Sequence, residues 1–119
     1  EVITPSITLW NWIMVRDLSG RHYVIDGGTK RPFNSDGQVQ NSWTNNGAVS
    51  VPQVTNGFLN LLPNNNNIER GVKGSKAPVY AVEGIAKRWI QSPTTAAFYA
   101  PIIRVSDSLI NVLPNGPNL

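Results

Sequence analysis

The sequence contains two diverged copies of one pattern, and this internal repeat limits the possible folds more than any other feature. Residues 22–35 recur 57 positions later as residues 79–92, with identical Tyr, Gly, Lys, Arg and Ser. Residues 54–64 recur as residues 105–115 at an offset of 51 positions, so the first copy holds six extra residues between the two blocks. Two matches in the same order indicate a duplicated unit.

The first block of each copy predicts a β-hairpin. Alternating apolar residues lead into two-residue loops, Gly27-Gly28 and Gly84-Ile85. A glycine at the first loop position is typical of a type II′ turn, and Gly-Gly also permits type I′. This register places Tyr23, Ile25, Lys30 and Pro32 on one face, and likewise Tyr80, Val82, Lys87 and Trp89. Both faces are mixed in character, so the pattern leaves open which one is core.

Each hairpin has a predicted strand before it and predicted helices after it. The strands are expected at residues 9–16 and at about 68–73, which gives one antiparallel meander per copy. Ser35 and Ser92 are candidate N-caps for a first helix, with Pro93 at the favoured first helical position. Thr55 and Ser106 are candidate N-caps for a second short helix. In the first copy the segment 38–53 is longer and Asn-rich, and this leaves open whether the first helix forms there.

These patterns predict a β-rich α+β fold within a single domain, residues 1–119. The two pseudo-repeats span about 9–64 and 68–115, and each is an antiparallel meander or hairpin followed by one or two short helices. Leu119 aligns with Ile68, where a further copy would begin. We therefore expect either a fragment of a longer repeat protein or a two-copy protein whose last strand docks on itself.

Bulk composition narrows the class of protein. Charged residues make up only 14% of the chain, the net charge is +3, and there are no cysteines. Disulfides, thiolate metal sites and cysteine nucleophiles are thereby excluded. The basic residues are dispersed, whereas nucleic-acid binders concentrate them on one face, which argues against nucleic acid as a partner. The apolar stretches are too short for a membrane span.

The repeat resembles a short tandem repeat of bacterial surface and cell-wall-associated proteins. The shared features are Tyr, an apolar residue, an acid and Gly, then Lys-Arg and Ser, followed by Val-Ser-Asp and Leu-Pro-Asn-Gly, as at 105–107 and 113–116. In that family the pattern reads roughly Val-Tyr-Leu-Ile-Glu-x-Gly-Lys-Lys-Arg beside catalytic domains. The resemblance covers about 45 residues of each copy and implies a secreted or cell-surface accessory role. It carries over no defined ligand residue.

Catalytic chemistry has little support in the sequence. His22 is the only histidine, and we expect it to be a strand residue with a satisfied hydrogen bond rather than a metal ligand or a member of a Ser-His-Asp system. Asp26 and Glu83 are imaginable as a pair of glycosidase carboxylates. Their equivalent positions at hairpin shoulders favour capping of the turn or pairing with a nearby lysine. We expect no enzyme activity, cofactor or metal.

Aromatic residues are the better lead to function. Trp10, Trp12, Trp43 and Trp89 are candidate ligand-binding residues together with Tyr23 and Tyr80, because sugars stack on aromatic faces beside amides and acids. The alternative is that these side chains fill the core, as Trp and Tyr are highly buried on average. Trp43, in the Asn-rich segment, is the one most expected to be exposed.

The remaining candidate ligand residues are Asp26, Glu83 and the pairs Lys30-Arg31 and Lys87-Arg88. These cations either keep a sheet edge soluble or meet anionic polymers. Two functions follow. The first is a non-catalytic extracellular module that binds glycans or cell-wall polymer. The alternative is a structural or assembly module, such as a surface-layer unit, spacer or virion component, that acts through protein partners or self-association.

Overall fold

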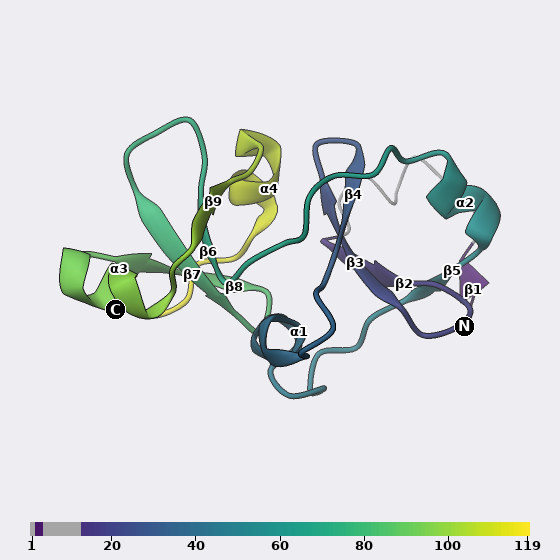
Figure 1. Ribbon diagram of the computed structural model, residues 1–119, viewed down its shortest axis with the longest axis horizontal. Coiled ribbons are helices and arrows are strands. Elements are labelled where there is room, and N and C mark those ends of the chain that lie inside the picture. Colours follow the sequence, from purple (N-terminus) through teal and green to yellow (C-terminus); the bar gives the residue numbers. More distant parts are fainter. Residues whose placement is uncertain (1, 4–12) are drawn as a thin grey trace.

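The computed structural model describes residues 2–3 and 13–119, and these form a small α+β protein with two mixed β-sheets and four short helices. The sheets lie toward opposite ends of the long axis, with helix α1 (Gln38–Thr44) below and between them in the view of Figure 1. None of the described helices has the length and apolar character needed to cross a membrane.

The first sheet has the strand order β1-β5-β2-β3-β4. Three of these strands form the predicted antiparallel meander, in which β2 pairs with β3 and β3 with β4. Strand β5 is parallel to β2, and β1 is parallel to β5 on its other side. The strands are β1 (Val2–Ile3), β2 (Met14–Arg16), β3 (His22–Asp26), β4 (Thr29–Pro32) and β5 (Gln53–Val54).

The second sheet has the order β8-β7-β6-β9, which corresponds to β4-β3-β2-β5 of the first. Its meander is again antiparallel, and β9 is parallel to β6. The strands are β6 (Gly71–Lys73), β7 (Val79–Glu83), β8 (Ala86–Ile90) and β9 (Ile102–Arg104). The parallel strands β5 and β9 were not predicted. They are two and three residues long, too short to show alternation in the sequence.

The predicted hairpin register is confirmed in both copies. Tyr23 is opposite Pro32, and Tyr80 is opposite Trp89. The expected type II′ turn at Gly84-Ile85 is wrong. Both residues have positive φ, 60° and 54°, the combination of a type I′ turn. A β-branched residue rarely adopts this conformation. Here the Ile85 side chain packs against the core, and its N–H donates to the carbonyl of Trp43 at 2.9 Å.

Three of the four predicted N-caps are confirmed. The hydroxyl oxygens of Thr55, Ser92 and Ser106 accept hydrogen bonds from N–H groups in the first turns of α2 (Asn56–Asn60), α3 (Pro93–Phe98) and α4 (Asp107–Val112). Ser35 is not a cap. Helix α1 begins three residues later, after Gly37, whose φ of 79° suits glycine.

Two hydrophobic clusters form the core. The smaller lies within the first copy, where Val15, Ile25 and Val54 meet Phe58 and Leu59 of α2. The larger contains residues of both copies, so the two copies share it. Its members include Met14, Val24, Phe33, Val39 and Trp43 from the first copy, and Val72, Val82, Val105, Leu109 and Leu113 from the second.

The expected exposure of Trp43 is therefore wrong, because this side chain has 0% exposure. It lies on α1, within the longer segment between the two blocks of the first copy. Its indole N–H donates to the carbonyl of Glu69 at 3.0 Å, and its ring meets Phe33 edge-on with centroids 6.4 Å apart. The polar composition of this segment predicted a loop, but the segment contains a helix whose apolar side faces the core.

The outer edges of β4 and β8 are covered by main chain. In the first sheet, Lys30 exchanges backbone hydrogen bonds with Pro63 and Asn65, and Ile68 N–H donates to Pro32. In the second, Lys87 does the same with Pro114 and Gly116, and Leu119 N–H donates to Trp89. The polar connector 64–67 and its counterpart 115–118 thus act as extra edge pairing.

Candidate functional site

Asp26 and Arg31 form a buried ion pair between the two sheets. The Arg31 Nε donates to Asp26 Oδ2 at 2.6 Å, and the two side chains are 9% and 3% exposed. Arg31 also donates to the carbonyl of Arg104 at 3.1 Å, while Asp26 accepts from the N–H of Ser106 at 2.9 Å. These two side chains therefore bind the edge of the other copy and are not available to a ligand.

Glu83 and Arg88 repeat this pair in the second copy, in an exposed setting. Glu83 Oε1 lies 2.8 Å from Arg88 Nη1, with side-chain exposures of 43% and 28%. Arg88 also donates to the carbonyl of Pro117. Both acids thus pair with an arginine five residues later, whereas the prediction was capping of the turn or pairing with a nearby lysine.

Lys30 and Lys87 are engaged at helix C-termini. The ammonium of Lys30 donates to the carbonyls of Leu59 and Leu62, and that of Lys87 donates to the carbonyl of Ile110. Carbonyls at a helix C-terminus lack intrahelical partners, so a lysine there satisfies them and meets the negative end of the helix dipole. The two lysines fix the helices α2 and α4 to their hairpins.

The aromatic candidates differ in exposure. Trp89 on the edge strand β8 is 44% exposed, whereas Trp43 is in the core. Tyr23 and Tyr80 are partly exposed. The Arg21 guanidinium lies over the Tyr23 ring, 5.9 Å from its centroid. Trp10 and Trp12 fall outside the described residues.

Tyr80 forms part of an open groove of about 300 Å³ between the second hairpin and α4. The groove is also lined by Gly74, Lys76, Pro78, Lys87, Asp107, Ile110 and Asn111. Trp89 is the cross-strand partner of Tyr80, so the two aromatic side chains stand on the same face of the sheet. Of the predicted site residues, the structure thus brings together Tyr80, Lys87 and Trp89.

Sequence reasoning missed Lys76, Asp107 and Asn111. Asp107 and Asn111 are four residues apart on one side of α4, next to apolar residues that indicated only a core-facing helix. Lys76 lies in the loop between β6 and β7. A periodicity signal for α4 existed, but nothing in the sequence brought this helix and that loop to Tyr80.

Asp107 shapes the groove by holding this loop. Its carboxylate accepts hydrogen bonds from the backbone N–H of Ser75 at 2.8 Å and from the Ser75 hydroxyl at 2.5 Å. The Ser75 hydrogen bonds lower the pKa of Asp107 below its ordinary value, and nearby Lys76 and Arg104 add to this. A side chain at Gly74 would place its Cβ 2.3 Å from Asp107 Oδ1, so glycine permits the close approach.

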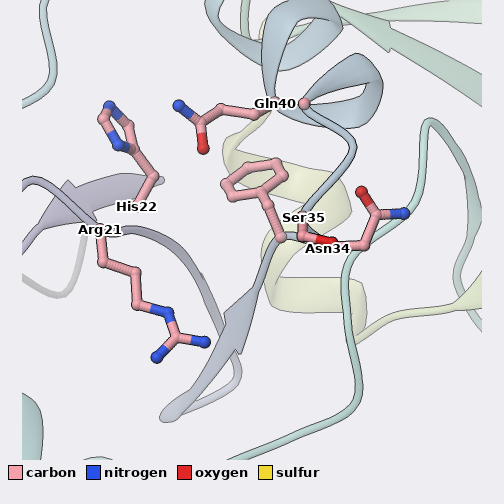
Figure 2. A pocket seen from close by; sticks show the side chains of 7 residues that line it. Arg21, His22, Asn34, Ser35 and Gln40 are labelled. Atoms are coloured by element: carbon pink, nitrogen blue, oxygen red, sulfur yellow. The ribbon is translucent and has the colours of Figure 1, made fainter.

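A second cavity, of about 370 Å³, lies beside β3 and the start of α1. Figure 2 shows the His22 ring and the Gln40 amide on the same side of it, whereas Arg21 extends away from both and Asn34 lies on the opposite side. His22 Nδ1 is 2.8 Å from the carbonyl of Gly20, the satisfied strand histidine that was predicted. The polar groups of this cavity diverge, which makes it a poorer ligand site than the Tyr80 groove.

A third hollow, of about 380 Å³, lies between α1 and the second hairpin. Its lining is rich in amides and includes Asn41, Asn45, Asn46, Arg70 and Glu83. No aromatic ring lines it, so it offers hydrogen bonds without a stacking surface.

No family model, curated protein or solved structure matches this chain.

Proposed function

We propose that the chain is a non-catalytic extracellular module that binds glycans or cell-wall polymer in the Tyr80 groove. The observation that carries the proposal is the position of Tyr80, whose ring lines the groove beside Asn111 and Lys76. The C–H faces of a sugar ring stack on aromatic rings, and amide and ammonium groups hydrogen-bond its hydroxyls. Trp89, across the hairpin, extends the aromatic surface for a longer chain.

We also infer that the module consists of two copies of one unit, with the bounds given by the sequence pattern. Equivalent contacts support this inference. Lys30 and Lys87 each form a parallel bridge with an asparagine, Asn64 or Asn115, and each holds the C-terminus of the following helix. Among the described helices, α1 differs from its counterpart α3, because α1 carries the buried Trp43 whereas α3 has no buried residue.

The role assigned to Tyr80 is supported by a contrast between the copies. At Tyr23, the ring has the Arg21 guanidinium over it. At Tyr80, the residue that corresponds to Arg21 is Pro78. The Lys87 ammonium lies over this ring, 5.6 Å from its centroid, but the ring also lines an open groove. We therefore place the binding site in the second copy alone. The pairing of Asp26 and Glu83 with arginines supports a binding role over a catalytic one.

An assembly module is the second candidate, favoured by one observation. Phe98 on α3 is 75% exposed, a large apolar side chain suited to a protein contact. The covered edges of β4 and β8 make pairing of strands between molecules the less suitable route.

Tryptophan fluorescence during titration with wall polysaccharides and oligosaccharides tests the proposal. Trp89 is exposed beside the groove and Trp43 is fully buried, so a ligand at Tyr80 changes the emission of Trp89. We expect Tyr80→Ala to weaken binding about fivefold, which corresponds to about 1 kcal/mol for an aromatic contact. Asn111→Ala, a change on the exposed side of α4, weakens it several-fold without a packing cost.

Tyr23→Ala is the matched control, because it removes the equivalent ring outside the groove. Its binding curve should coincide with that of the unaltered protein, with folding checked by circular dichroism. Loss of affinity in both tyrosine variants alike, or a blank titration with every glycan, would refute the proposed site.

A further inference from the structure

We infer that the Tyr80 groove selects glycans that carry negative charge, and that Lys76 is the residue that determines this preference. The inference rests on the proposed function, since it names the class of ligand for the same groove. The contacts that each charged group around Tyr80 makes support this preference.

The one acidic side chain in the groove lining has about half of its acceptor capacity engaged. Asp107 accepts from both the N–H and the hydroxyl of Ser75, one bond at each carboxylate oxygen. A neutral sugar needs acceptors for its hydroxyl protons, and carboxylates are the strongest acceptors among side chains. Because Asp107 is partly engaged by the loop, the groove offers a neutral sugar fewer acceptors than a free carboxylate would provide.

The cations of the groove are differently placed. Lys87 is fixed, since its ammonium donates to the carbonyl of Ile110 and lies 5.6 Å from the centre of the Tyr80 ring. Its charge is held over the ring that we propose as the stacking surface. Lys76 is exposed on the loop that Asp107 holds, and among the described residues it forms no ion pair. Its ammonium therefore has all three donors available to a ligand.

The two cations and one acid leave the groove with an excess of positive charge. Arg104, close enough to lower the pKa of Asp107, adds to the positive field. A carboxylate, sulfate or phosphate attached to a sugar that stacks on Tyr80 would thus lie within reach of Lys76. Lys76 would contact such a charge directly. Lys87 and Arg104 would attract it through the electrostatic field of the groove.

The test compares two oligosaccharides of equal length, hyaluronan hexasaccharide, which carries carboxylates, and the neutral cellohexaose. Titration calorimetry at about 50 mM and about 300 mM salt gives the affinities, because screening weakens contacts between exposed charges. We expect the acidic oligosaccharide to bind at least tenfold more tightly at low salt, with most of that difference lost at high salt.

Two variants locate the effect. Lys76→Gln should lower affinity for the acidic oligosaccharide about fivefold, the order expected for an exposed charge pair, and leave cellohexaose unchanged. Arg21→Gln removes the same charge from the first copy and should have no effect. Equal weakening by both variants would show a general charge effect and overturn the role of Lys76.

The remaining outcomes also decide. Equal affinity for the acidic and neutral oligosaccharides overturns charge selection and leaves the proposed glycan site intact. Absence of binding to either, together with a blank titration against wall polymers, overturns both. Tighter binding of a single-stranded oligonucleotide than of the acidic oligosaccharide would assign the positive groove to nucleic acid and likewise overturn the inference.

Discussion

Asp26 and Glu83 hold corresponding positions in the two hairpins, and each pairs with an arginine, yet only the first pair is buried. Burial changes what an ion pair contributes. Removal of one partner from a buried pair leaves a charge without water or counterion, whereas an exposed pair exchanges its contact for solvent at little cost. The chain therefore contains an internal comparison between two chemically similar pairs.

We predict that Asp26→Asn lowers the free energy of unfolding by about 3 kcal/mol, because Arg31 then remains buried without its partner. Glu83→Gln should change it by less than about 1 kcal/mol. Urea unfolding followed by circular dichroism measures both. Similar losses of stability in the two variants would contradict the role of Asp26 in the buried contact between the two sheets.

Asp107 gives a prediction for pH dependence at the residue scale. Its pKa in the folded chain is lowered by the Ser75 hydrogen bonds from the ordinary value of 3.8. The bonds are therefore fully present above that pH and are lost as the pH falls through the folded value. The amide resonance of Ser75, followed by NMR, should shift with a midpoint below 3.8. In Asp107→Asn this transition should vanish, and a midpoint at or above the ordinary value would contradict the contact.

At the scale of elements, the helices that follow the two hairpins begin at different positions and use different caps. Ser92 accepts from Thr95 N–H at 3.1 Å at the start of α3, while α1 starts beyond Ser35. We predict that Ser92→Ala costs about 1 kcal/mol of stability, typical of a lost N-cap. Ser35→Ala, at the equivalent position, should stay within about 0.5 kcal/mol of the unaltered protein. Denaturant midpoints measure both, and a larger loss at Ser35 would contradict the assigned start of α1.

The same elements show how far local sequence signals reach. Hairpin register, three N-caps and the meanders follow from alternation, turn residues and hydroxyl side chains, which act over a few residues. The parallel strands β5 and β9 depend on partners more than 25 residues away, Arg16 for Gln53 and Gly71 for Ile102. The type I′ turn at Ile85 likewise depends on contacts with α1. Such features have no local signal.

The candidate site was predictable only in part, for the same reason. Tyr80 and Trp89 stand out as aromatic residues of a hairpin, and their pairing follows from its register. Lys76, Asp107 and Asn111 reach the groove through the packing of α4 and the loop before β7. Trp43 is the opposite case. Its polar neighbours in the sequence predicted an exposed side chain, but tertiary packing buries it.

For the whole molecule, the larger core cluster makes the two copies depend on each other. Trp43 of the first copy contributes to a cluster with Val72, Val82 and Leu109 of the second. We predict that Trp43→Ala lowers stability by about 3–5 kcal/mol, as for other buried Trp truncations. Hydrogen exchange should rise in both sheets together.

Phe58→Ala is the matched control for Trp43→Ala. Phe58→Ala removes a large side chain from the smaller cluster, within the first copy alone. Exchange in the second sheet should then rise only through global unfolding. If Trp43→Ala loosened just the first sheet, the copies would be separate folding units, contrary to the shared core.

The covered edges of β4 and β8 affect how molecules of this protein would contact each other when many lie close together. Segments 63–68 and 114–119 leave these strands no row of unpaired amides with which one molecule could recruit another. Molecules crowded on one surface would then not extend each other's sheets at these two edges. At β4 and β8, contact between neighbours would then be made by side chains and not by the main chain of these strands.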